Sequence, residues 1–279
     1  MNTGKPDFRL DHLNISSENP EATAKFYGRA LQMEVSPRDG GEWLCCGPQR
    51  RVMFSAGPRN QLHYASFVVA DEAALTRLRE GIQAAGGRCA PSVSALFRHP
   101  GAFSVNDPDG NVVNFSVAAD ADQTAREGLS GRLQHVVFKT RDIHRLMNHY
   151  AQIIGFVVSD RVETEEGELK ACFLRGDNEH HSMAIFAGSS DCLDHHSYEA
   201  GEWALLRDWG DHLSSEYITI SWGPGRHGAG NNLFFMFDDP EKNWLEISAE
   251  LEIIDDRPLK VWEHSERSLN LWGKGHIRT

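Results

Sequence analysis

Apolar and polar residues follow the same succession of patterns twice along the chain. Residues 9–16 alternate between polar and apolar positions, as a half-buried strand does, and residues 132–139 repeat this alternation. Apolar residues at helical spacing follow each stretch, which predicts a helix after each strand. Pro20 suits the start of the first helix, and Gly155 suits the end of the second. The residues with helical spacing are Ala24, Tyr27 and Leu31 in the first copy and Ile143, Met147, Tyr150 and Ile154 in the second.

The later parts of the two copies also correspond. Residues 107–116 and 239–248 each begin with a turn signal and continue as an alternating strand. A further strand followed by a helix is expected in the middle of each copy: strands 62–69 and 193–199, and helices 72–85 and 203–213. Because these landmarks recur in one order at a spacing of nearly half the chain, they indicate an internal duplication.

The duplication predicts two α+β domains. We expect the first at residues 1–120, a linker near 119–131, and the second at 131–279. The tail that follows the last strand, with Trp262 and Trp272, is expected to pack back onto the second domain.

Composition narrows the class of protein. The 279 residues include 28 Lys and Arg against 40 Asp and Glu, a net charge of −12, whereas a nucleic-acid binder needs a basic face. No apolar run approaches the roughly 18 residues that cross a bilayer, and the first residues lack the apolar core of a signal peptide. Five cysteines, with Cys45 and Cys46 adjacent, suit reduced thiols better than a disulfide scaffold. We therefore expect a cytoplasmic protein without nucleic-acid or membrane partners.

Three predicted strands of the second copy each offer one residue that can bind a metal. These residues are His135, one of the pair His195 and His196, and Glu246. Because a strand directs alternate side chains to one face, a curved sheet can aim one residue from each strand at a common point. Two imidazoles and one carboxylate are the facial set that holds non-haem Fe(II) with open positions.

The first copy lacks the charged member of this set. His12, Tyr64 and Asn114 stand at the matching positions. Since Asn114 supplies no charge, we expect the first domain to be metal-free and the second to be the catalytic one.

Five segments of the second copy match a known family. They are residues 133–135, 178–184, 193–199, 222–227 and 239–246. From about residue 9 to the tail, the chain resembles the type I extradiol ring-cleavage dioxygenases of the vicinal oxygen chelate (glyoxalase/bleomycin resistance/dioxygenase) superfamily. The resemblance implies an α+β fold in which paired βαβββ modules form two open barrels in tandem, with the metal in the C-terminal barrel.

The resemblance also implies a ligand set. His135, His195 and Glu246 correspond to the Fe(II) ligands, with Mn(II) as the alternative metal. His195 is preferred over His196 because the family places a small residue two positions after the ligand histidine. Strand alternation would direct His196 to the opposite face.

Three further residues complete the implied active site. His181, on an apolar strand with His180 facing away, corresponds to the acid/base histidine, and His227, after a Gly-Pro-Gly turn, to a histidine that hydrogen-bonds substrate or oxygen. Met236 stands where the family usually has a tyrosine, and it has no proton to donate. His181, His227 and Met236 are thus the expected substrate-binding residues.

The implied activity is Fe(II)-dependent extradiol cleavage in the catabolism of aromatic hydrocarbons. Both atoms of O2 enter a catecholic ring, which opens beside the diol (meta cleavage). The expected partners are a catecholic substrate, O2 and further copies of the chain in a homo-oligomer. One alternative is a metal-dependent isomerase or lyase that does not use O2, although such enzymes usually draw ligands from two modules, which Asn114 disfavours. The other is a non-catalytic small-molecule binder, which would not need His181 and His227.

Overall fold

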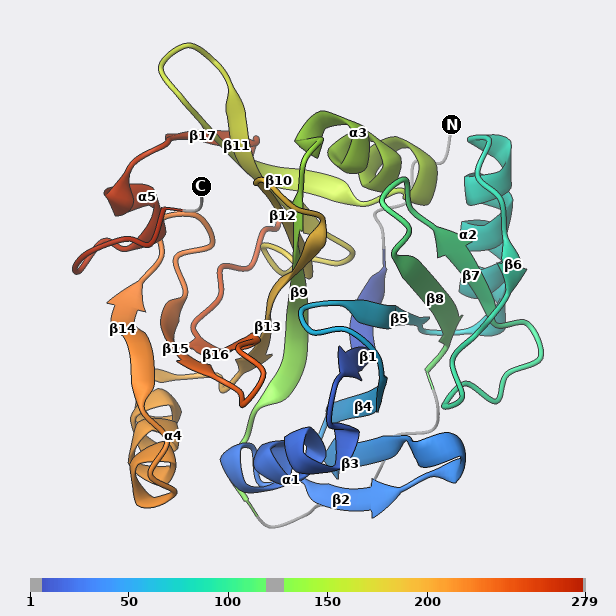
Figure 1. Ribbon diagram of the computed structural model, residues 1–279. Helices are drawn as coiled ribbons and strands as arrows, with labels where there is room; N and C mark the ends of the chain where they lie inside the picture. Colours follow the sequence, from blue (N-terminus) through green and yellow to red (C-terminus); the bar gives the residue numbers. More distant parts are fainter. Residues whose placement is uncertain (1–6, 119–127, 278–279) are drawn as a thin grey trace.

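Two curved mixed sheets lie side by side with most of their helices at the periphery (Figure 1). The computed structural model describes residues 7–118 and 128–277. Most of the linker expected at 119–131 lies outside the described residues, and so do residues 1–6.

The first sheet consists of two βαβββ modules joined edge to edge. Its strand order is β2-β3-β4-β1-β5-β8-β7-β6, so the first strand of each module lies at the centre. The elements are β1 (Phe8–Ser17), α1 (Pro20–Ala30), β2 (Glu34–Pro37), the 3-10 turn η1 (Asp39–Gly41), β3 (Trp43–Gly47), β4 (Arg50–Ala56), β5 (Leu62–Val69), α2 (Glu72–Ala84), β6 (Ala90–Pro91), β7 (Phe103–Asn106) and β8 (Val112–Val117).

The second sheet repeats this plan and adds one strand at its edge. Its order is β14-β15-β16-β13-β9-β12-β11-β10-β17. The elements are β9 (Arg132–Thr140), α3 (Ile143–Asn148), the π-helix η2 (His149–Ile154), β10 (Val157–Glu163), β11 (Leu169–Arg175), β12 (Met183–Ala187), β13 (Cys192–Glu199), α4 (Trp203–Ser215), β14 (Ile220–Arg226), β15 (Leu233–Asp238), β16 (Trp244–Ala249), β17 (Lys260–Glu263) and α5 (Glu266–Leu269). The tandem arrangement of paired modules confirms the predicted fold class.

Local sequence signals set the helix boundaries. The Asn19 side chain accepts a hydrogen bond from the Ala22 amide, and Pro20 opens α1, as its fixed φ favours. At the far end of η2, Gly155 adopts a left-handed conformation with φ of 100°. Both predicted boundaries are confirmed.

The pairing register is the same in the two sheets. In each sheet, a serine on a central strand has one partner on each of the two neighbouring strands, and both partners are residues compared from the sequence as possible metal ligands. These trios are His12, Ser66 and Asn114 in the first sheet and His135, Ser197 and Glu246 in the second. Register therefore relates the two sets of positions residue by residue.

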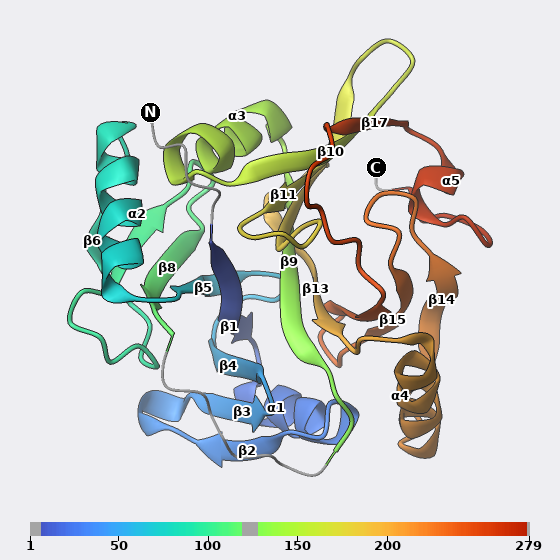
Figure 2. The ribbon, with the colours of Figure 1, turned by 180° about the vertical axis from the view of Figure 1, so that it is seen from behind.

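The two halves share a hydrophobic core and several buried polar contacts. Strands β1 and β9 run side by side at the centre of the molecule in both views (Figures 1 and 2). The Phe8 and Phe156 rings pack edge to face with centroids 4.7 Å apart. At the opposite end of β1, Ser17 Oγ donates to Glu241 Oε1 over 2.7 Å. Such contacts mean that the folded state of each half is stabilised by packing against the other.

The tail packs back onto the second half, as expected. Strand β17 pairs in parallel with β10, and Trp262 Nε1 donates a hydrogen bond to Asp160 Oδ2 over 2.8 Å. Trp272 lies against Trp203 with ring centroids 6.0 Å apart.

The cysteines and helices agree with the expectations from composition. All five cysteines are free thiols. Within the described residues, no helix combines the length and the apolar character needed to cross a bilayer.

Candidate metal centre

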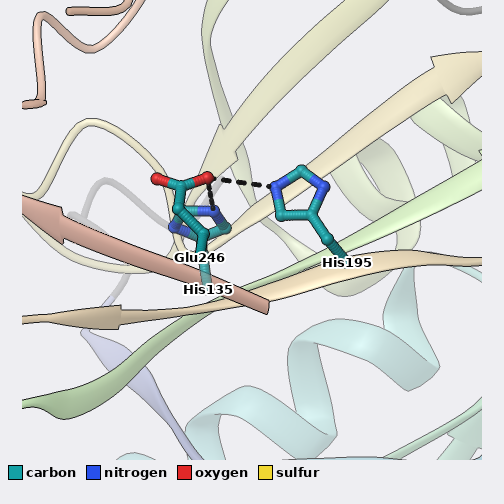
Figure 3. A group of neighbouring side chains, drawn as sticks. All are labelled: His135, His195 and Glu246. Atoms are coloured by element: carbon teal, nitrogen blue, oxygen red, sulfur yellow. Dashed lines mark ion pairs between the residues drawn. The ribbon is translucent and has the colours of Figure 1, made fainter. Parts of the chain in front are cut away.

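Three neighbouring strands of the second sheet bring two histidines and one glutamate together (Figure 3). His135 lies on β9, His195 on β13 and Glu246 on β16, and all three are buried. Glu246 Oε2 lies 3.8 Å from His135 Nε2 and 3.4 Å from His195 Nε2. The candidate ligand atoms all lie within 4.8 Å of one another, which is close enough for one ion to contact all three.

Hydrogen bonds behind the two imidazoles fix which nitrogen faces Glu246. His135 Nδ1 lies 2.5 Å from Gln134 Oε1, and His195 Nδ1 lies 2.6 Å from Asp194 Oδ1. Because these oxygens accept hydrogen bonds, each Nδ1 carries the proton in the neutral ring and each Nε2 keeps a lone pair. This is the arrangement that orients histidine ligands in metal sites.

The two acceptors are the extra residues of β-bulges. Between β9 and β13, Ser197 pairs with His135 and Tyr198 with Leu133, so Gln134 has no partner position. Asp194 is skipped in the same way between Leu193 and His195. A bulge turns its extra side chain out of strict alternation, so each acceptor reaches the ring of the residue after it.

Charges at the centre favour a cation. Burial lowers the pKa of His135 to about 3, so this imidazole is neutral at neutral pH. Burial alone would raise the pKa of Glu246, but contacts with His195 and His227 bring it well below its ordinary value, so this group is ionised. Burial would likewise lower the pKa of His195, but the nearby carboxylates of Asp194 and Glu246 favour the protonated ring, outweigh this effect and raise the pKa.

Among the described residues, no lysine or arginine forms an ion pair with Glu246. The donor set therefore has the composition and the negative charge that suit a divalent metal ion.

The neighbouring His196 points to the opposite side of β13. Its Nε2 lies 3.1 Å from the hydroxyl oxygen of Tyr27 in the first half, and the two rings are stacked. Of the adjacent histidines, only His195 thus faces Glu246.

His181 lies beside His135, but not on a strand. Strand β12 begins at Met183, and residues 176–182 form a loop, so the strand expected at His181 starts two residues later. The rings of His181 and His135 have centroids 4.4 Å apart. Burial, with the neighbouring His135, brings the pKa of His181 well below its ordinary value, so it is neutral.

The expectation that His180 faces away from His181 is wrong. Strand alternation does not apply in the loop, and the two Nδ1 atoms lie 2.9 Å apart with perpendicular rings.

His227 also reaches the centre, by a route that differs from the expected turn. Its Gly-Pro-Gly segment lies inside β14, where the register with β15 shifts between Trp222 and Gly225, so the predicted turn is wrong. β14 is an edge strand, where proline is tolerated. His227 Nδ1 donates to the Leu269 carbonyl over 2.5 Å, and its Nε2 lies 3.8 Å from Glu246 Oε2.

A pocket of mainly apolar side chains opens beside these groups. The pocket is small and partly open to solvent. Met236, on β15 opposite Glu246, contributes to the wall, so all the residues singled out in the sequence for the active site meet here. The lining residues that the sequence did not indicate are Val137, Phe173, Ala184, Phe186, Ala229, Ser268 and Leu269.

The matching positions of the first sheet form hydrogen bonds with neighbouring residues instead. His12 Nδ1 lies 2.5 Å from Asp11 Oδ2, and His12 Nε2 lies 2.6 Å from Ser94 Oγ. Asn114 Oδ1 accepts from Ser92 Oγ and from the Val93 amide. Hydrogen bonds within the first half therefore occupy both side chains, with the Asp11 carboxylate and a hydroxyl at His12 and a hydroxyl and a backbone amide at Asn114.

Comparison with known proteins agrees with this architecture. Residues 9–115 and 132–247 match the model of the Glyoxalase/Bleomycin resistance protein/Dioxygenase superfamily. Metapyrocatechase 2 of Cupriavidus necator is 24% identical over 246 residues, which cover 79% of this chain and 74% of that protein.

Two solved structures share the fold. The Mn(II)-bound glyoxalase from Novosphingobium aromaticivorans has a TM-score of 0.80 at 25% identity, covering 97% of this chain and 92% of that one. Homoprotocatechuate 2,3-dioxygenase from Brevibacterium fuscum, in its complex with 3,4-dihydroxyphenylacetate, has a TM-score of 0.81 at 21% identity, covering 99% and 92%.

Proposed function

Because the chain belongs to the Glyoxalase/Bleomycin resistance protein/Dioxygenase superfamily, we propose that it is an extradiol dioxygenase that opens a catecholic ring beside its diol. One observation carries this proposal. Two imidazoles with fixed Nε2 lone pairs and one carboxylate converge at the wall of a pocket that also contains His181 and His227. An isolated metal-binding set would not need two further histidines within reach of the same cavity.

His135, His195 and Glu246 would hold the metal, which we propose to be Fe(II), with Mn(II) as the alternative. When bound, Fe(II) supplies the electron transfer that the reaction of an aromatic ring with O2 requires. The protein's own contribution is to hold three ligands on one side and leave the pocket side free for substrate.

His181 and His227 are proposed as the proton-handling groups of the pocket. As a neutral imidazole, His181 would take the proton that a catechol hydroxyl loses on binding and return it later in the reaction. The Nδ1 proton of His227 is held by the Leu269 carbonyl, so its Nε2 presents a lone pair toward Glu246 and the pocket. It can therefore accept a hydrogen bond from a substrate hydroxyl.

The pocket wall supports a substrate class. Among the described residues that line it, none is lysine or arginine, whereas Val137, Phe173, Phe186 and Met236 are apolar. A carboxylate on the substrate would be buried there without a cationic partner, which is costly. We therefore propose a catechol with an uncharged alkyl or aryl substituent.

The test is anaerobic reconstitution with Fe(II), followed by oxygen uptake and ultraviolet–visible spectra. Catechol, 3-methylcatechol and 2,3-dihydroxybiphenyl are compared with 3,4-dihydroxyphenylacetate. We expect uptake of one O2 per ring opened, a coloured ring-cleavage product, and preference for the uncharged substrates. Tight binding of a catechol without oxygen uptake would contradict the proposed activity.

A metal-dependent isomerase is the second candidate, since one similar structure is named a glyoxalase. It would turn over its substrate without consuming O2, so the oxygen electrode separates the two. The homo-oligomer and the division into domains 1–120 and 131–279 stay predictions.

A further inference from the structure

We infer that Asp160 and His180 are positioning residues that fix the tautomer of His181, so that its Nε2 is the nitrogen without a proton. The inference rests on the proposed function only for the use that His181 makes of this nitrogen. The tautomer itself is a property of the chain and can be measured without turnover.

The network starts from a buried carboxylate on β10. Asp160 Oδ1 accepts hydrogen bonds from Arg257 Nη1 at 2.8 Å and from the Lys260 amide at 3.2 Å, and Oδ2 accepts from Trp262 Nε1 at 2.8 Å. Burial alone would raise the pKa of Asp160, but its contacts with His180, Trp262 and Arg257 lower this pKa to about 2. Asp160 is thus ionised and can only accept hydrogen bonds.

His180 lies between this carboxylate and the active site. Its Nε2 is 3.0 Å from Asp160 Oδ2, an ion-pair contact without the alignment of a hydrogen bond, and both side chains are fully buried. Since a carboxylate has no proton to give, the imidazole nitrogen that faces it carries one. In neutral His180 the proton is therefore on Nε2, and Nδ1 has a lone pair.

The second contact transmits this choice to His181. The Nδ1 atoms of His180 and His181 lie 2.9 Å apart. With an acceptor at His180 Nδ1, His181 Nδ1 must be the donor. In the neutral ring, His181 Nε2 is then left with a lone pair, and His181 is one of the residues that line the pocket.

The tautomer decides what His181 can do. With the lone pair on Nε2, the ring can accept a hydrogen bond or a proton from a substrate hydroxyl. In the other tautomer Nε2 carries a hydrogen and can only donate. Asp160 and His180 would thus prepare His181 to act as a base before substrate binds, although neither residue contacts the substrate.

The first experiment measures the tautomer in the full-length, metal-free chain labelled with ¹⁵N-histidine. Long-range ¹H–¹⁵N correlation spectra distinguish protonated from unprotonated ring nitrogens, and loss of one set of signals in His181→Gln assigns His181. We expect a protonated Nδ1 and an unprotonated Nε2. A His181 ring with its proton on Nε2 would overturn the inference.

The sharpest variant is Asp160→Asn, which has nearly the same shape. Its carbonyl oxygen is expected to face Arg257 and the Lys260 amide, so its NH2 group faces His180, loses the hydrogen bond from Trp262 Nε1 and no longer favours a proton on His180 Nε2. The Nε2–H tautomer of His181 should then increase. Asp107→Asn is the matched control, because Asp107 is a buried carboxylate of the first sheet that bonds Tyr150 and Asn111. An unchanged His181 tautomer in folded Asp160→Asn would contradict the inference.

A second pair of variants keeps the test decisive if Asp160→Asn does not fold. His180→Asn can place an amide oxygen near the position of Nδ1 and should preserve the tautomer, whereas His180→Leu has no acceptor and should yield a mixture. Equal tautomer populations in these two variants would refute the role of His180.

Kinetics connect the tautomer to the proposed activity. In the Fe(II)-loaded enzyme, His180→Leu should lower kcat by up to about 100-fold with little change in KM or metal content, and His180→Asn should restore part of the loss. If no substrate is cleaved but the spectra show the expected tautomers, the proposed function fails and the inference on His181 stands.

Discussion

The two halves of the molecule have the same strand order and the same register, yet among the described residues only the second gathers a metal-binding set of side chains. One difference in backbone is the connection after the third strand of the first module. In the first half, Pro48 and Gln49 alone join β3 to β4, whereas residues 176–182 join β11 to β12. This longer loop carries His180 and His181. The comparison teaches that the sheet supplies matching positions in both halves, while the proposed acid/base residue, His181, lies on a loop that is much longer in the second half.

Side chains explain why the first half is stable without a cation. Asn114 replaces a carboxylate, so no buried charge needs a metal to balance it. His12 keeps its bulge acceptor, Asp11, but its other nitrogen bonds Ser94. A former ligand position can thus be closed by hydrogen bonds without any change of fold.

The largest effect is expected from the ligands themselves. Glu246→Gln removes the carboxylate charge and His195→Ala removes a donor, so each should weaken metal binding by more than about 100-fold, beyond the loss typical of outer-shell changes. Metal analysis should show about one equivalent in the parent chain and in His12→Ala, and almost none in the first two variants. Two equivalents in the parent chain would contradict a metal-free first half, and loss of metal in His196→Ala but not in His195→Ala would contradict the ligand assignment.

Removal of the loop histidine should separate catalysis from metal binding. Register places Arg50 of the first half at the position that matches His181, so the first half has no counterpart. His181→Ala should keep the metal and slow ring cleavage by about 100-fold or more, the usual contribution of a positioned acid or base. Stopped-flow spectra measure the cleavage step, and a rate close to that of the parent chain would remove His181 from the mechanism.

The difference between the halves can also be tested by building a metal site into the first half. Tyr64→His with Asn114→Glu would give β1, β5 and β8 the same three donors as the second half. We expect a second equivalent of metal to bind, about 10- to 100-fold more weakly, because the bulge residue before position 64 is His63 rather than a carboxylate. Calorimetry measures both sites, and adding His63→Asp should strengthen the new one. A rebuilt chain that folds and binds only one equivalent would show that register alone does not make a site.

A smaller effect is expected at Met236. Its counterpart in the first half is Ser104, whose hydroxyl donates to the Pro91 carbonyl. Met236→Tyr adds a donor and bulk to the pocket, so kcat/KM should rise for unsubstituted catechol and fall for bulky catechols, each by about 10-fold. Steady-state kinetics with both substrates measure this, and parallel changes for the two would argue against contact with the ring substituent.

The smallest effect concerns pH and the longer loop of the second half. Burial and the charge of Glu179 raise the pKa of Asp177 to about 6. The folded state thus favours protonated Asp177, and this stabilisation is full below about pH 4 and is lost as the pH rises through 6. Asp177→Asn should therefore gain about 1 kcal/mol or less over the parent chain at pH 7 and nothing at pH 4. Urea unfolding of the metal-free chain at both pH values measures the difference, and an equal gain at both would exclude titration of Asp177 as its cause.

Most of the fold could be predicted because strand and helix periods repeat in the sequence. The alternation at residues 9–16 and 132–139 corresponds to β1 and β9, and the turn signals before β8 and β16 fall where expected. Strand β17 could not be predicted, because its register depends on Asp160 and the edge of β10 rather than on its own pattern.

The side chains that hydrogen-bond the two metal-site histidines could not be predicted from the sequence, for a different reason. Alternation predicts that Gln134 and Asp194 point away from the histidines that follow them. The bulges that reverse this are a property of pairing between β9 and β13 and leave no signal in either strand alone. The same limit applies to His180, which alternation directs away from His181.

The adjacent histidines of β13 have a consequence for how this strand tolerates insertions and deletions. A slip by one residue reverses every side chain of a strand, so it usually turns that strand's metal ligand away from the site. Here a slip that moves His196 into the position of His195 would keep an imidazole facing Glu246, while Ser197 would take the position that faces Tyr27. The group lost would be Asp194, since the residue before the new ligand would be a histidine. A lineage carrying such a change would keep a weakened site that a single later substitution could repair.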